Sequence, residues 1–255
     1  MKYGIVGATG RVGQLLVNII KNSDDILSAV MFTGKQSVEF PEKTIITNDA
    51  KTLLENSDVA IDFSAPIATQ KLLEAALENP KPLVIATTGL NDHQKNLMIE
   101  ASQKAPILYA TNMSLGVAIL NKLVAMVSEK LKDFDIEIVE QHHRYKVDAP
   151  SGTALTLAKT CANARGLELK DVMITGRSGH VGARTKNEIG VFALRGGDVV
   201  GRHTVGFYND GEFLELNHTA TNRETFARGA IKVSKWLINQ KPGLYSINNA
   251  LGLRK

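Results

Sequence analysis

The sequence predicts an α/β protein in which a doubly wound parallel sheet is followed by a second, α+β domain with a mixed or antiparallel sheet. Two patterns lead to this prediction. Continuous apolar runs separated by amphipathic helical stretches fill the first half of the chain, and alternating strands joined by turn residues fill much of the second. With 255 residues, 44% of them hydrophobic, the chain is long enough to bury two cores.

The first half contains five apolar runs that we expect to be strands, at residues 3–7, 26–32, 58–64, 82–89 and 106–112. Helical patterns separate these runs. In the first helix the apolar residues recur on one face, namely Val12, Leu15, Leu16, Ile19 and Ile20. Because the five runs are continuous rather than alternating, each strand would be buried on both faces, as in a parallel sheet.

From about Asn112 the pattern changes. Residues 114–131 read as a long helix, residues 134–143 alternate as a strand, and another helix follows from Thr153. Residues 188–220 fit three strands joined by glycine and Asn-Asp-Gly turns. This alternation indicates a mixed or antiparallel sheet with one face open to water.

The last helical stretch, residues 225–240, is expected to return to the first domain. We therefore expect one domain from residues 1–112 and 222–255, and another from residues 113–221. The sequence has no linker rich in Pro, Gly or Ser, so short segments at the two boundaries would connect the domains.

Small or hydroxyl residues end each of the five predicted strands. They are Gly7, Thr33 with Gly34, Ser64, Thr87 with Thr88, and Thr111 with Asn112. In an open parallel sheet the ligand lies outside the carboxyl ends of the strands, so these residues would share one edge. Such residues also make ordinary turns and helix caps, but five strand ends in succession favour a ligand site.

A glycine-rich loop follows the first strand. The segment GATGRVG places Gly7, Gly10 and Gly13 between a strand and a helix, with one residue more between the first two than the usual dinucleotide fingerprint has. The first glycine would permit a tight turn, the second the approach of a pyrophosphate, and the third close packing of helix on strand. The loop indicates a Rossmann-type dinucleotide-binding domain; a plain turn is the alternative.

The end of the second strand bears on the choice of cofactor. An acidic residue there would bind the ribose 2′-hydroxyl of NAD, but this strand ends in Thr33, Gly34 and Lys35. No carboxylate would repel a 2′-phosphate, and Lys35 could attract one, although it could equally be a solvated loop lysine. We therefore expect NADPH to be accepted, alongside NADH.

The segment EQHHRYKVDAPSGTA, residues 140–154, concentrates positive charge beside a helix start. Its histidines and Lys146 follow an apolar strand, and Ser151, Gly152 and Thr153 begin the next helix. Backbone N–H groups there, with a hydroxyl, could bind a carboxylate. Histidine and lysine are also suited to proton transfer. A metal site would need more ligands than the nearby Asp148 supplies, so no metal is expected.

Composition argues against nucleic-acid binding, membrane insertion and a disulfide framework. The net charge of +4 comes from dispersed lysines and arginines, so nucleic-acid binding is not indicated. Arg11 and Gln14 interrupt the apolar start of the chain, and no run is long enough for a membrane helix. A single cysteine excludes an intrachain disulfide and fits a reducing compartment. We expect a cytoplasmic protein without a membrane partner.

The combination of VGATGRVG, residues 6–13, with residues 140–154 resembles the dihydrodipicolinate reductase family. The motifs IDFSAP, ATTGL, ATNMSLGV, GRSGHVGART and GDVVGRHTV extend the likeness over nearly the whole chain. The resemblance implies NAD(P)H-dependent reduction of 4-hydroxy-tetrahydrodipicolinate, a cyclic dicarboxylate, to tetrahydrodipicolinate on the diaminopimelate route to lysine. It also implies a homotetramer built across the second sheet.

The resemblance further implies site residues. The cofactor would be held by Gly7, Ala8, Thr9, Gly10, Arg11, Val12, Ala86, Thr87, Thr88, Ala110, Thr111, Asn112 and Met113. The substrate would be bound by His143, Lys146, Gly152 and Thr153, and His142 and Lys146 would form the proton-transfer pair. Which of the two donates the proton is left open, as is the role of residues 176–186. Some members carry an acid where Thr33 stands, which argues against strict NADH dependence here.

Two other classes compete with this interpretation. Aldehyde dehydrogenases that form a thioester share the two-domain pattern, but the only thiol, Cys161, lies in an amphipathic helix where packing is its expected role. A nucleotide-sensing regulator would use the first domain alone. It would leave the histidine and lysine segment without a function.

Overall fold

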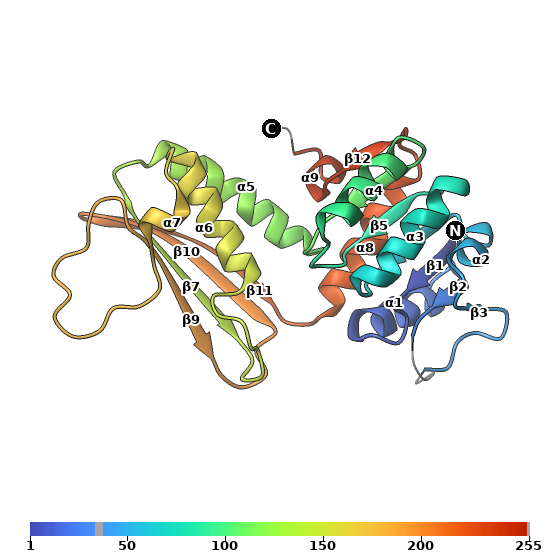
Figure 1. The fold of residues 1–255 in the computed structure, drawn as a ribbon. Helices are drawn as coiled ribbons and strands as arrows, with labels where there is room; N and C mark the ends of the chain where they lie inside the picture. The colour runs from blue at the N-terminus through green and yellow to red at the C-terminus, as the bar shows by residue number, and fades with distance from the viewer. Residues whose placement is uncertain (34–37, 254–255) are drawn as a thin grey trace. The chain divides into compact units, whose positions relative to one another are not determined.

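A computed structural model describes residues 1–33 and 38–253 of the chain (Figure 1). The chain divides into two compact units, one formed by Met1–Leu115 with Arg223–Lys255 and the other by Gly116–Asn222. The expected domain boundaries were after residues 112 and 221. Within the described residues, no helix is both long and apolar enough to cross a membrane.

The first unit contains a parallel sheet with seven strands in the described part of the chain. Its order is β12-β6-β5-β4-β1-β2-β3, so the chain builds outward from β1 in both directions. The strands are β1 (Lys2–Val6), β2 (Ile26–Met31), β3 (Ile45–Thr47), β4 (Val59–Asp62), β5 (Leu83–Ile85), β6 (Pro106–Tyr109) and β12 (Gly243–Tyr245). The predicted doubly wound parallel sheet is confirmed. No sequence pattern predicts β3 and β12, which are only three residues long.

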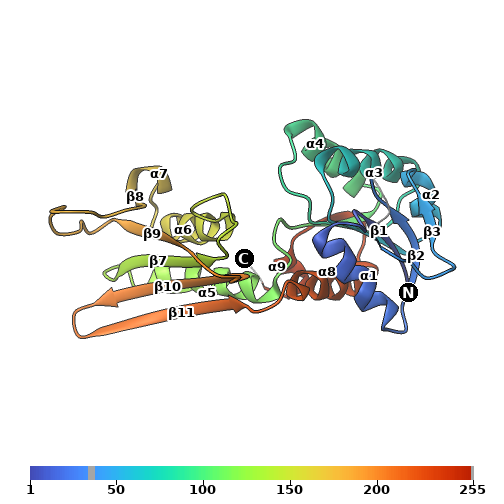
Figure 2. The same cartoon turned by 90° about the horizontal axis from the view of Figure 1, so that it is seen from below.

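Helices cover both faces of this sheet (Figure 2). On one face α1 packs beside α8, and on the other α3 contacts both α2 and α4. Their bounds are α1 (Arg11–Lys21), α2 (Ala50–Glu55), α3 (Pro66–Glu78), α4 (Asp92–Ser102) and α8 (Glu224–Leu237), and the short α9 (Ile247–Ala250) follows β12. Every residue of β4 and β5 is buried, which explains their continuous apolar sequences.

The second unit contains a mixed sheet of five strands within the described residues, in the order β11-β10-β7-β9-β8. Strand β10 pairs antiparallel with β7 and β11, whereas β9 pairs parallel with β7 and β8. The strands are β7 (Asp135–His142), β8 (Met173–Ile174), β9 (Ile189–Arg195), β10 (Gly201–Asn209) and β11 (Glu212–Ala220). A helical crossover between β7 and β9 makes their pairing parallel, so the sheet is mixed.

Helices α5 (Leu115–Lys130) and α6 (Gly152–Ala164) cover one face of this sheet, and the short α7 (Leu169–Val172) follows α6 (Figure 1). Strand β7 shows the expected alternation. Ile136, Ile138 and Glu140 are buried, and the residues between them are only partly covered. The third buried position of this strand is therefore a carboxylate rather than an apolar side chain.

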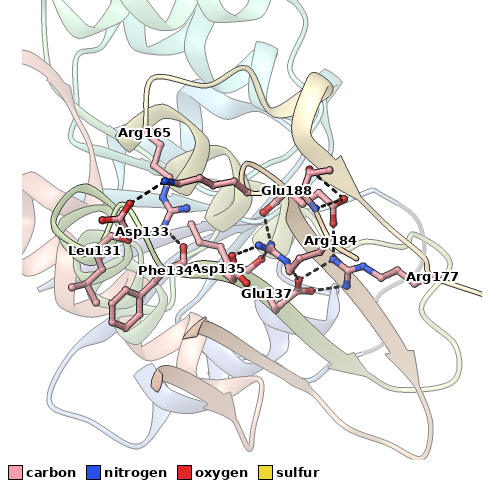
Figure 3. Close-up of polar contacts among 12 residues, drawn as sticks. Leu131, Asp133, Phe134, Asp135, Glu137, Arg165, Arg177, Arg184 and Glu188 are labelled. Atoms are coloured by element: carbon pink, nitrogen blue, oxygen red, sulfur yellow. Dashed lines mark hydrogen bonds and ion pairs between the residues drawn. The ribbon is translucent and has the colours of Figure 1, made fainter. Parts of the chain in front are cut away.

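Arginines attach the loop that contains residues 176–185 to the central strand β7 and to Glu188, which precedes β9 (Figure 3). Arg177 donates to both carboxylate oxygens of Glu137, at 3.1 and 2.9 Å, and to Glu188 at 3.1 Å. Arg184 donates to Glu137 at 3.3 Å and to the backbone oxygen of Glu188 at 2.7 Å, and it also pairs with Asp135. These contacts give the loop an anchored conformation within its own unit.

Candidate active site

The loop between β1 and α1 depends on its glycines. Gly7 has a φ of +82°, a left-handed conformation that favours glycine. A Cβ atom on Gly13 would lie 2.0 Å from the carbonyl oxygen of Gly7, and one on Gly10 would lie 3.2 Å from the same atom. The absence of side chains therefore lets the N-terminus of α1 sit against the end of β1, an arrangement that suits a phosphate group.

A cavity of about 740 Å³ opens at this edge of the sheet. It is lined by Val6, Gly7, Thr9, Gly10, Met31, Phe32, Thr33, Asn48, Phe63, Ser64, Ala65, Ile67, Ala68 and Lys71. Its volume lies within the range of roughly 300–1,000 Å³ that is usual for small-molecule sites. Apolar side chains with a few polar groups suit the adenosine half of a dinucleotide.

The structure brings some of the predicted cofactor residues to this cavity and not others. Gly7, Thr9, Gly10 and Thr33 line it, whereas Ala8, Arg11 and Val12 belong to the same loop and helix without lining it. Residues 86–88 follow β5 and residues 110–113 follow β6, farther along the same edge of the sheet. Lys35 lies outside the described residues.

A buried carboxylate, Asp62, organises this edge. It is fully buried and accepts hydrogen bonds from the hydroxyls of Ser64 and Thr69, both at 2.5 Å, and from the Ser64 N–H at 3.0 Å. Burial raises the pKa of Asp62, although these hydrogen bonds act in the opposite direction. The Thr87 hydroxyl accepts from the same Ser64 N–H at 3.3 Å. Asp62 thus joins the ends of β4 and β5.

A second buried carboxylate, Glu140, lies in the histidine and lysine segment. Its side chain is 0% exposed. It accepts hydrogen bonds from His142 Nδ1 at 2.6 Å, from two guanidinium nitrogens of Arg195 at 2.8 Å each, and from the Ser151 N–H at 2.9 Å. Burial alone would raise the pKa of Glu140, but its donors outweigh burial and lower it. The group is therefore a carboxylate at neutral pH.

His142 is held by this carboxylate. Burial lowers the pKa of His142 below its usual 6.5, the contact with Glu140 raises it, and the charges of Lys146 and Arg195 lower it further. The imidazole is therefore mainly neutral at pH 7. Because Glu140 accepts from Nδ1, the proton of the neutral ring is on Nδ1 and Nε2 carries the lone pair.

Lys146 has a carboxylate partner of its own. Its ammonium group donates to both carboxylate oxygens of Asp148, at 2.7 and 2.9 Å, and this contact lowers the pKa of Asp148. His143 precedes this turn, and its ring lies 6.4 Å from that of Tyr145. The backbone N–H of His143 donates to Val199 at 2.7 Å, so the segment is attached to the loop between β9 and β10.

The three residues predicted to bind an anion at the start of α6 differ in their exposure to solvent. Ser151 is buried, and its hydroxyl caps the helix by accepting from the Ala154 N–H at 3.2 Å and contacts His203 Nε2 at 3.1 Å. Gly152 is exposed, and a Cβ atom there would meet no atom within 4 Å. Thr153 is partly buried in the first turn. The capping role of Ser151 leaves Gly152 as the open position of this helix start.

Acid is expected to destabilise the protein through His203. Burial, and next the charge of His142, lower the pKa of His203 from 6.5 to about 4; Glu140 opposes this, and His218 and Lys146 add to it. Below pH 6.5 His203 binds a proton in the unfolded chain but not in the folded protein. The free energy of unfolding is therefore at its full value above pH 6.5 and decreases as the pH falls toward 4. At about 1.4 kcal/mol per pKa unit, the loss is on the order of 3 kcal/mol.

The measurement is the free energy of unfolding in urea between pH 7 and 4, compared with a His203→Gln variant. The variant should show a flatter pH dependence than the natural sequence. Equal slopes for both proteins would contradict this role of His203.

The single cysteine does not act as a nucleophile. Cys161 is fully buried in α6, and burial raises the pKa of its thiol to about 11. A thiol with this pKa carries almost no thiolate at neutral pH. The thioester class of aldehyde dehydrogenase is therefore excluded.

Sequence reasoning missed Glu140, Arg195 and His203 as members of the site. One signal was available, since Glu140 occupies a buried position in the alternation of β7. A charged residue on the apolar face of a strand is rarely left without a partner. The partner itself, Arg195, is 55 residues away and could not be identified from the pattern.

A nucleotide-sized cavity at the edge of a parallel sheet, and a separate unit with a histidine and lysine site at a helix start, define the chain as a two-domain nicotinamide-dependent oxidoreductase. Family models described as the N-terminus and the C-terminus of dihydrodipicolinate reductase match residues 1–113 and 116–251. The chain belongs to the dihydrodipicolinate reductase family.

Individual relatives agree with this assignment. The 4-hydroxy-tetrahydrodipicolinate reductases of Aliarcobacter butzleri and Sulfurovum sp. are 65% and 61% identical to the chain, covering 99% of it and 100% and 99% of their own lengths. A dipicolinate-bound dihydrodipicolinate reductase from Paenisporosarcina sp. has the same fold, with a TM-score of 0.80 at 23% identity over 98% of both chains.

Proposed function

We propose that this protein reduces 4-hydroxy-tetrahydrodipicolinate to tetrahydrodipicolinate with NAD(P)H, in the diaminopimelate route to lysine. The relatives that share 57–65% of its residues bear the name of this reductase. The observation that carries the proposal is the site around Glu140, where His142 and Lys146 lie beside the start of α6. This arrangement combines proton transfer with carboxylate binding.

The substrate is a dicarboxylate. Its conversion to tetrahydrodipicolinate requires loss of the 4-hydroxyl group as water, a hydride at one ring carbon and a proton at the neighbouring atom. The nicotinamide supplies the hydride when it is bound. Gly152 is an exposed residue, and its N–H group with the dipole of α6 suits one substrate carboxylate. Lys146 can exchange its contact with Asp148 for the second substrate carboxylate. Because His142 is mainly neutral at pH 7, we assign the donated proton to Lys146.

An absorbance assay at 340 nm, the standard nicotinamide wavelength, tests the reaction directly. The freshly formed product of dihydrodipicolinate synthase is the substrate, and NADH and NADPH are supplied in turn. Substrate-dependent oxidation of the cofactor is expected. A protein that binds the dinucleotide without oxidising it would contradict the proposed function and favour a nucleotide-sensing regulator.

NADPH is expected to support turnover at least as well as NADH. Among the residues that line the cavity in the described part of the chain there is no Asp or Glu, and Lys71 lies there with Thr33. A cationic lining without a carboxylate favours a 2′-phosphate. Titration of both cofactors tests this, and a preference for NADH of more than about a hundredfold, some 2.7 kcal/mol, would contradict it.

Binding of 2′,5′-ADP and 5′-AMP separates the 2′-phosphate contribution from catalysis. Lys71→Gln should weaken 2′,5′-ADP by about tenfold and leave 5′-AMP unchanged. Lys51→Gln, at an exposed lysine of α2 that does not line the cavity, is the matched control. Equal affinities of the Lys71 variant and the natural protein for 2′,5′-ADP would remove Lys71 from this role.

We also propose a homotetramer built across the second sheet, and a cytoplasmic location consistent with one free thiol. On the face away from α5 and α6, Phe213 is 67% exposed and Leu194 is 50% exposed, and β11 is an edge strand. Exposed apolar residues on an unpaired edge favour association. Sedimentation should give four times the chain mass of 27.7 kDa, and a monomer would contradict the proposal.

A further inference from the structure

We infer that Glu140 is a positioning residue, whose carboxylate holds His142 in one tautomer and at the same time fixes the start of the anion-binding helix α6. The inference rests on the proposed function for its catalytic consequence. It follows from the contacts that converge on this one side chain. None of these contacts involves the cofactor cavity, whose lining comes from the first unit alone.

Burial makes the geometry of Glu140 well defined. A fully buried carboxylate is strongly destabilising unless its lone pairs are satisfied by charged or backbone donors. Arg195 satisfies it with two parallel hydrogen bonds of 2.8 Å, the geometry typical of strong guanidinium pairs. The remaining donors are His142 Nδ1 and the Ser151 N–H. The carboxylate therefore cannot rotate without breaking charged hydrogen bonds.

The contact with Nδ1 determines which nitrogen of His142 can meet the substrate. With Nδ1 protonated toward Glu140, only Nε2 remains to accept or donate a proton. A Cβ atom built on Gly201 would lie 3.0 Å from Nε2, so a side chain at this position would crowd the nitrogen. The ring of His203 lies edge-on to that of His142, 5.2 Å away, and limits its movement on another side.

The Glu140 carboxylate contacts the proposed anion site both directly and through Arg195. The Ser151 N–H donates to Glu140 directly, and Ser151 is the residue that caps α6. Arg195, while bound to Glu140, also donates to the backbone oxygen of Asp148 at 2.6 Å. Asp148 is the ion-pair partner of Lys146. The Glu140 carboxylate therefore positions both the residues proposed for proton transfer and the helix start proposed for carboxylate binding.

The test is Glu140→Gln, which keeps the size of the side chain and removes its charge. The charged and titratable groups facing His142 are Glu140, Lys146, Arg195 and His203. Without the carboxylate the remaining cations favour the neutral imidazole still more. In the natural protein kcat/KM is expected to fall at low pH as His142 becomes protonated. In the variant this inflection should move down by about one pH unit, and kcat should fall at least about tenfold because His142 and the start of α6 lose their shared contact.

Glu137→Gln is the matched control. Glu137 lies on the same strand and is also paired with arginines, Arg177 and Arg184, but it has no contact with His142. Compared at equal oligomeric state, this variant should lose some stability and keep the natural kcat and pH profile. A Glu140→Gln variant that behaves like it, less stable but with an unchanged pH profile, would overturn the inference.

A second measurement does not depend on the variant folding or on turnover. Nitrogen-15 NMR of the natural protein should show neutral His142 protonated on Nδ1. Protonation on Nε2 would overturn the inference even if the enzyme is fully active. Conversely, an Nδ1 proton in a protein that does not reduce the substrate would contradict the proposed function and leave the positioning role of Glu140 intact.

Discussion

Lys146→Ala is expected to lower kcat by about two to four powers of ten, the range for loss of a general acid. The lysine is held on the loop before α6 by Asp148, within the second unit. The affinity for NADPH should change little, because the residues that line the cofactor cavity all belong to the first unit. Steady-state kinetics and cofactor titration of the variant measure both effects.

Lys159→Ala provides the control for removal of a positive charge. Lys159 is an exposed lysine of α6, on the same unit as Lys146. It should keep the natural kcat, whereas His142→Ala should lower kcat if the two residues share the proton. If Lys146→Ala keeps kcat and only raises KM, the lysine contributes uniform binding and the proton comes from His142.

Gly13→Ala is expected to lower both the stability of the protein and its affinity for the dinucleotide. The added Cβ atom would lie 2.0 Å from the Gly7 carbonyl oxygen and 2.9 Å from the Cα atom of Ala8. Both are backbone atoms, so the loop must move as a whole. We expect the free energy of unfolding to fall by about 1–3 kcal/mol, and dinucleotide affinity to fall more than tenfold.

The control for this substitution is Gly176→Ala, since a Cβ atom there would meet no atom within 4 Å. Thermal unfolding and calorimetric binding of NADPH compare the two variants. Gly176→Ala should match the natural protein in both. Wild-type affinity in a stably folded Gly13→Ala variant would show that close packing of α1 on this loop is not needed for the cofactor.

The local pattern of apolar residues was sufficient to predict the longer strands and helices of this fold. The apolar runs of β1, β2 and β4 are continuous because the strands are covered by helices on both faces, and β7 alternates because α5 and α6 cover only one face. Three-residue strands such as β3 contain too few residues to show any period. The helix between β7 and β9 was predicted, but the parallel pairing of these two strands was not.

By itself, the sequence determined the class of protein. The glycine loop, the apolar periodicity and the residues 140–154 are local patterns, so they specify a dinucleotide domain, a mixed second sheet and a cationic segment at a helix start. Only the tertiary structure decided which distant residues contact that segment and hold its side chains in place. Strand register brings Arg195 to Glu140 across 55 residues and His203 to Ser151 across 52. Such contacts depend on nonlocal pairing, and burial then makes one carboxylate the centre of the site, which local spacing cannot encode.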